Sequence, residues 1–136
     1  EREIKRGMNS IEFYQDFQPK AEKVKNDFLN FLLNAKKEEK TVAAYGAAAK
    51  GNTIMNFAGI RPDLISYIVD RNPTKQGKFM PGSRIPIMNE SFLIESKPDY
   101  IVILPWNLRD EVSHQLKIIR SWGGNFVVAV PILEIF

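Results

Sequence analysis

Residues 41–53 read TVAAYGAAAKGNT, and this stretch decides the fold that the rest of the sequence supports. Its apolar run, residues 42–45, predicts a buried strand, Gly46 predicts a tight turn, and Ala47 begins a predicted helix whose first turn contains Lys50. A helix N-terminus behind a strand and a glycine turn suits an anion. The first N–H groups of the helix have no intrahelical partners, and they lie at the positive end of the helix dipole. We therefore place the candidate site at this junction.

Composition indicates an ordinary globular domain. The chain has 136 residues, of which 44% are hydrophobic and 26% charged, which suits one domain. Its 19 basic and 16 acidic residues are mixed along the chain, so we expect no nucleic-acid partner. Cysteine is absent, which excludes disulfides and thiolate metal sites. No apolar run approaches the roughly 18 residues of a membrane span, and the N-terminus lacks the apolar core of a signal peptide. We expect a cytoplasmic protein with no membrane partner.

The remaining segments predict an α/β protein. Residues 1–10 are polar and are expected to form a linker or disordered arm, and residues 11–136 a single domain. A helical pattern covers residues 11–40, with Pro19 placed to open a helix at its first position. Further strands are predicted at residues 64–69, 85–87, 100–104 and 126–130, and helices at 47–58, 89–94 and 108–119.

The strands are mostly apolar throughout and alternate with helices, which indicates a parallel sheet covered on both faces. We therefore predict a Rossmann-like three-layer sandwich with a mostly parallel sheet, preceded by a long N-terminal helix. In such sheets ligands bind beyond the carboxyl ends of the strands, near the point where the strand order reverses. Polar segments follow three of the strands, at residues 46–53, 70–77 and 105–107. We expect these segments to converge in space.

The glycine motif fits neither of the two common nucleotide loops. Residues 46–53 follow the spacing GxxxxGK[ST], but Asn52 occupies the position of the phosphate-binding lysine, which argues against an NTPase. Ala48 occupies the second glycine position of GxGxxG, which argues against a nicotinamide dehydrogenase. One remaining interpretation is a general cradle for a phosphate or diphosphate, with Lys50 as counter-charge. The other is that the two glycines serve only close packing of the helix on the sheet.

Asp70 and its neighbours also have two interpretations. At the end of a strand, Asp70 either bonds a ribose hydroxyl or shapes the following turn. Arg71, Lys75 and Lys78 either add positive charge toward a diphosphate, with Arg71 favoured, or, as is usual for exposed lysines, do nothing specific.

Aromatic and catalytic candidates are equally open. Trp106 and Tyr45 either stack on a ring of the ligand or belong to the core. His114 is the single histidine and is expected to be exposed. Without a second histidine, a cysteine or a serine with a base partner, the sequence predicts no transition-metal site and no catalytic residue.

Four motifs in order give a resemblance: GAAAKGNT, PDLISYIVDRNPTKQGKFMPGSRIPI, KPDYIVILPWNLRDEV and WGGNFVVAVP. From about residue 14 to residue 131 the chain resembles the C-terminal domain of the sugar C-methyltransferases, which act on nucleotide-linked deoxysugars. The resemblance implies a three-part enzyme. Its N-terminal module binds zinc, its middle domain binds S-adenosylmethionine, and its C-terminal Rossmann-like domain closes over the nucleotide-diphosphate sugar.

By this resemblance twelve residues belong to the substrate side. Those expected to line it are Gly46, Ala47, Lys50, Gly51, Asn52 and Thr53, and those expected to flank it are Asp70, Arg71, Asn72, Pro105, Trp106 and Asn107. Methyl transfer needs donor and acceptor held in line, and these residues provide the acceptor side alone. We therefore expect a fragment that is catalytically incompetent by itself. S-adenosylmethionine, zinc and the S-adenosylmethionine-binding domain are expected in the full-length parent. The alternative is a non-catalytic Rossmann-like module for nucleotide binding or assembly.

Overall fold

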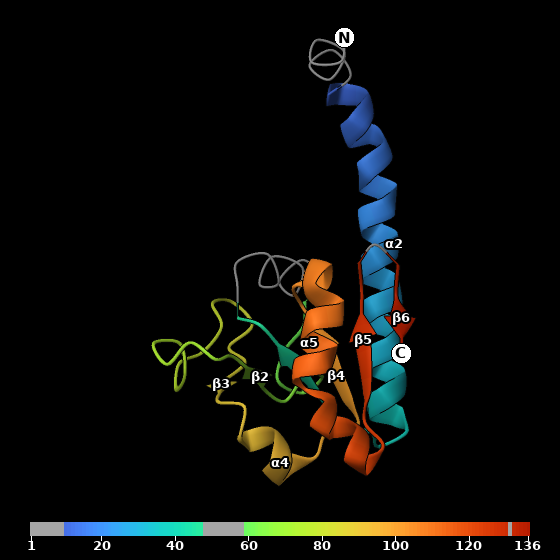
Figure 1. The fold of residues 1–136 in the computed structure, drawn as a ribbon. Helices are drawn as coiled ribbons and strands as arrows, with labels where there is room; N and C mark the ends of the chain where they lie inside the picture. Colours follow the sequence, from blue (N-terminus) through green and yellow to red (C-terminus); the bar gives the residue numbers. More distant parts are fainter. Residues whose placement is uncertain (1–9, 48–58, 131) are drawn as a thin grey trace.

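A long helix leads into the domain. The computed structural model describes residues 10–47, 59–130 and 132–136, with side chains described from residue 22 onward. Helix α2 (Ser10–Lys37) runs along one side of the sheet, and its first half extends beyond the rest of the domain (Figure 1). The helix passes through Pro19, so the expectation that this proline opens it was wrong. Proline prefers the first turn because it lacks an N–H group, but a 28-residue helix accommodates the loss of one main-chain hydrogen bond.

The described residues form one six-stranded sheet in the order β3-β2-β1-β4-β5-β6. Its strands are β1 (Val42–Tyr45), β2 (Ile68–Val69), β3 (Ile87–Met88), β4 (Tyr100–Ile103), β5 (Asn125–Val128) and β6 (Glu134–Ile135). The first five are parallel, and β6 runs antiparallel to β5. β1 pairs with β4 along its whole length, Ala44 opposite Val102. After β1 the chain adds β2 and β3 on one side of the sheet, and after β4 it adds β5 and β6 on the other side. The strand order therefore reverses between β1 and β4.

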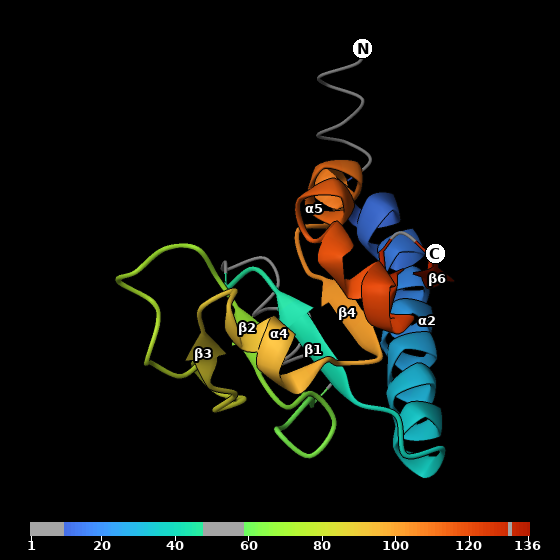
Figure 2. The same ribbon diagram turned by 60° about the horizontal axis from the view of Figure 1, so that its bottom comes forward.

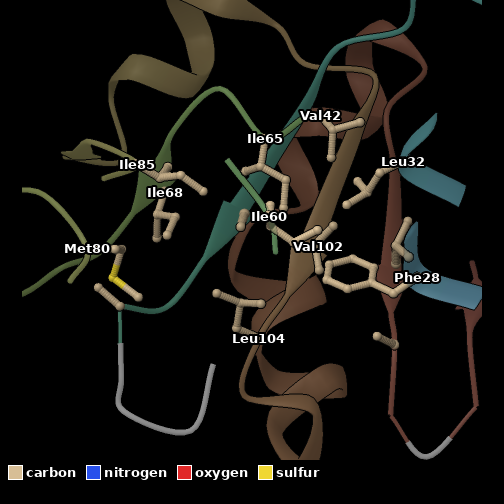
Figure 3. Packing of buried hydrophobic residues seen from close by; sticks show 14 of the residues in the cluster. Phe28, Leu32, Val42, Ile60, Ile65, Ile68, Met80, Ile85, Val102 and Leu104 are labelled. Carbon is tan, nitrogen blue, oxygen red and sulfur yellow. The ribbon is translucent and has the colours of Figure 1, made fainter. Parts of the chain in front are cut away.

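Apolar side chains cover both faces of the sheet. On one face Phe28 and Leu32 of α2 pack with Val102 and its neighbours (Figure 3). These two α2 side chains have no exposed surface, which anchors the helix to the sheet. Full burial of such side chains stabilises a fold by about 1.5–3 kcal/mol each.

The opposite face carries the shorter helices. These are α4 (Phe92–Ser96) and α5 (Arg109–Gln115), with the 3-10 turns η1 (Trp106–Leu108) and η2 (Lys117–Trp122). Leu93 of α4 and Val112 of α5 pack against Ile101 and Ile103 of β4. Figure 2 shows α4 in front of the central strands. The predicted Rossmann-like sandwich with a mostly parallel sheet is therefore confirmed.

Several element boundaries differ from the prediction. The second strand begins at Ile68 because residues 61–65 form a turn in which the N–H of Leu64 donates to the carbonyl of Arg61 at 2.9 Å. The helix expected over residues 108–119 is divided into α5 and η2. The predicted sheet ends before Pro131, so β6 is a strand that the sequence pattern does not indicate.

Candidate functional site

The loops that follow β1 and β4 meet at the reversal point of the sheet, which we call the switch point and define by Gly46, Ala47 and Pro105. Gly46 has φ +97°, and its N–H donates to the carbonyl of Val69 at 2.9 Å. A Cβ atom at Gly46 would lie 2.7 Å from Cδ of Pro105. Only glycine satisfies both the backbone angle and this close approach. The two predicted site segments at residues 46–53 and 105–107 are thus in contact.

The loop after β2 is bonded to the same point. The N–H of Ala47 donates to Oδ2 of Asp70 at 2.8 Å, and its carbonyl accepts from Nζ of Lys75 at 2.9 Å. Ala47 is 8% exposed, so its side chain is part of the core and has little surface to offer a ligand. All three polar segments therefore converge, as the topology predicted.

Asp70 organises its own loop as well. Its Oδ1 accepts the N–H of Asn72 at 2.8 Å, and its carbonyl accepts from Nε2 of Gln76 at 2.8 Å. Asn72 repeats the pattern, since its Oδ1 accepts the N–H of Thr74 at 3.0 Å. Both carboxylate oxygens of Asp70 thus accept hydrogen bonds from backbone N–H groups, and these bonds shape the turn. Each oxygen keeps a second lone pair, so a bond to a ribose hydroxyl is chemically compatible with these contacts.

Arg71 belongs to a second network on the α4 and α5 side. Its Nε donates to Oε2 of Glu90 at 2.7 Å, and the same oxygen accepts from Nε2 of Gln115 at 2.6 Å. Gln115 also contacts the hydroxyl of Tyr45 at 3.0 Å. The hydrogen bond to Glu90 raises the pKa of the Arg71 guanidinium, which remains cationic. The side chain of Arg71 is 65% exposed while its Nε is paired with Glu90.

The segment after β4 places two further site residues. Trp106 is half-buried and packs against the core beneath α4 and α5, while Asn107 is exposed. Asn107 does not directly precede α5, because η1 intervenes and Leu108 is the residue before the helix. Trp106 therefore packs on the core and, being half-buried, keeps some exposed surface.

Lys50, Gly51, Asn52 and Thr53 lie outside the described residues, so the structure leaves these four predictions as they were.

Pattern reasoning did not find the roles of Lys75, Gln76, Glu90 and Gln115. No sequence pattern indicates these roles, because each of the four side chains forms its hydrogen bond with a residue of another segment or with a carbonyl of its own loop.

The described residues hold neither a metal-binding cluster nor a membrane-spanning helix. They contain no group of three or more histidine, aspartate or glutamate side chains placed to hold a metal ion. Within the same ranges, no helix combines the length and the apolar character needed to cross a bilayer.

Comparison with known proteins agrees with the motif order. The family model described as the C-methyltransferase C-terminal domain matches residues 1–131. The chain is also 33% identical over 129 residues to the C-methyltransferase NovU of Streptomyces niveus. That alignment covers 95% of this chain and 31% of the relative, so the chain spans less than a third of that protein's length. The predicted resemblance to C-methyltransferase C-terminal domains is confirmed.

Proposed function

The chain belongs to the C-methyltransferase C-terminal domain family, and from this premise we propose that it forms the acceptor side of an S-adenosylmethionine-dependent C-methyltransferase that acts on a nucleotide-linked deoxysugar. The supporting observation is the convergence at the switch point. Gly46 touches Pro105, and Asp70 binds Ala47, so residues from three loops surround the place where Rossmann-like sheets bind ligands.

In this proposal the diphosphate is bound mainly by residues 50–53. The N–H of Ala47 is already engaged by Asp70, so the phosphate contacts fall to Lys50, Gly51, Asn52 and Thr53. The Arg71 side chain adds positive charge from the neighbouring loop. Asp70, Asn72, Trp106 and Asn107 flank the sugar and the base.

The methyl group comes from another part of the same polypeptide. S-adenosylmethionine supplies it as an electrophile, and the domain described here holds the sugar carbon in line with it. The chain has no cysteine, and the described residues contain no cluster of metal ligands, so they do not fit a zinc site. We therefore assign zinc and the methyl donor to the remainder of the parent enzyme and give no residue of this chain a chemical step.

Calorimetric titration with thymidine diphosphate and with a thymidine-diphosphate-linked deoxysugar tests the proposal. The wild-type protein should bind both. Lys50→Ala should weaken binding by about 1.5–3 kcal/mol, the contribution of a charged hydrogen bond, while the unfolding free energy stays nearly unchanged. Lys117→Ala is the matched control at an exposed position in η2 and should bind normally.

Two results would overturn the proposal. Absence of binding at millimolar ligand, by both this chain and the full-length protein, removes the acceptor-side role. Binding by a full-length protein that transfers no methyl group from S-adenosylmethionine favours the non-catalytic nucleotide-binding or assembly module instead.

A further inference from the structure

The direction in which the chain leaves β1 is not fixed by β1 itself. Gly46 follows the strand with φ +97°, and glycine adopts backbone angles of either sign at little cost. An external constraint therefore helps to fix the backbone at Ala47. The described contacts that supply it are the two bonds to Ala47, one from Asp70 and one from Lys75.

Lys75 is held for this role by its own loop. Its N–H donates to the carbonyl of Asn72 at 3.0 Å, and its carbonyl accepts the N–H of Lys78 at 3.2 Å. The side chain is partly buried and ends 2.9 Å from the carbonyl of Ala47. Backbone hydrogen bonds on both sides of Lys75 thus fix the turn, and its ammonium group binds the carbonyl of Ala47.

Ala47 is bound by an anion at its N–H and by a cation at its carbonyl. Asp70 brings a carboxylate to the backbone of Ala47, and this charge by itself would repel a diphosphate bound nearby. Lys75 brings a positive charge to the same residue and offsets it. Loss of Lys75 therefore has two effects that act in the same direction, because the loop loses one bond and the carboxylate loses its counter-charge.

We propose that Lys75 is a positioning residue for the anionic part of the substrate, acting through the carbonyl of Ala47 and through the charge of Asp70. The inference rests on the proposed function and adds to it a residue outside the glycine motif. The positive charge of Lys75 acts on the diphosphate, so binding of the methyl donor should not depend on this residue.

Steady-state kinetics of the full-length enzyme test the inference with Lys75→Met, Lys75→Arg and the control Lys117→Met. We expect Lys75→Met to raise the KM for the nucleotide-linked sugar roughly tenfold, equivalent to about 1.4 kcal/mol, with kcat and the KM for S-adenosylmethionine nearly unchanged. Lys75→Arg keeps the charge and a donor, so it should recover most of the affinity. Lys117→Met, at an exposed position outside the site, should behave as the wild type.

The outcomes separate the two proposals. A wild-type enzyme that does not use a nucleotide-linked sugar overturns the proposed function and this inference with it. If the wild-type enzyme uses such a sugar, equal KM values for Lys75→Met and Lys117→Met overturn the inference alone. If Lys75→Met lowers the melting temperature strongly, Lys75→Gln replaces it, since this variant keeps a donor and loses only the charge. An unchanged sugar KM in a stable Lys75→Gln protein also counts against the inference.

Discussion

Replacement of Gly46 by alanine tests the geometry of the switch point. The substitution has two structural costs. A positive φ costs an L-residue about 1–2 kcal/mol, and Gly46 has φ +97°. In addition, the new Cβ would lie 2.7 Å from Cδ and 3.2 Å from Cγ of Pro105, so the loop or the ring has to move. Overpacking of this kind costs about 1–3 kcal/mol. Gly46→Ala should therefore lower the unfolding free energy by about 2–5 kcal/mol.

Gly77→Ala is the matched control. Gly77 has φ +83°, and a Cβ there would meet nothing within 4 Å, so this variant carries the backbone cost without the contact. Both substitutions reduce the freedom of the unfolded chain alike, so that effect cancels in the comparison. The difference between the two losses then measures the contact with Pro105.

Urea unfolding followed by circular dichroism provides the free energies. Gly46→Ala should lose about 1–3 kcal/mol more than Gly77→Ala, and adding Pro105→Ala should recover part of that excess. Equal losses for the two glycine variants would refute the reasoning, because the loops after β1 and β4 would then not be in contact.

Two further predictions concern Asp70 and Tyr67. Asp70→Asn leaves one acceptor for two backbone N–H groups, so we expect the unfolding free energy in urea to fall by about 1–3 kcal/mol. The control Asp63→Asn, at an exposed ion pair of 3.6 Å, should change it by less than about 0.5 kcal/mol. Equal effects of the two variants would contradict the loop-organising role of Asp70. Burial raises the pKa of Tyr67 above its ordinary value of 10.0, and the bond to Ser96 opposes this shift less strongly. Because the folded state disfavours the phenolate, the stabilisation by Tyr67 should be complete below pH 10 and should be lost as the pH rises through its folded-state pKa. Tyr67→Phe should reduce this alkaline fall in unfolding free energy. An identical alkaline profile for Tyr67→Phe would contradict the prediction.

Elements that follow from local apolar patterns were predicted well. β1 ends at Tyr45 before a glycine of positive φ, as the motif indicated, and β4 occupies the predicted apolar run. The convergence of three loops followed from parallel topology alone, because the carboxyl ends of parallel strands lie at one edge. These features depend on neighbours in the sequence or on the order of the strands.

Features that depend on distant partners were not predictable. The bond from Lys75 to Ala47 spans 28 residues, and the bond from Gln115 to Tyr45 spans 70. No local pattern distinguishes Lys75 from Lys78, since both are lysines on one polar loop. β6 was missed for a similar reason, because Glu134 pairs only once β5 offers an edge.

The most direct measurement is a titration of the ¹⁵N-tryptophan-labelled chain with a nucleotide-linked deoxysugar, followed through its two indole N–H signals. Trp106 adjoins the switch point, whereas the indole of Trp122 donates to the carbonyl of Pro98 at 2.9 Å, near the amino end of β4. If the switch point binds the substrate, the Trp106 signal should shift in a saturable way while the Trp122 signal stays in place. Saturable binding that moves only Trp122, or no change in either signal at millimolar ligand, would contradict the proposed site.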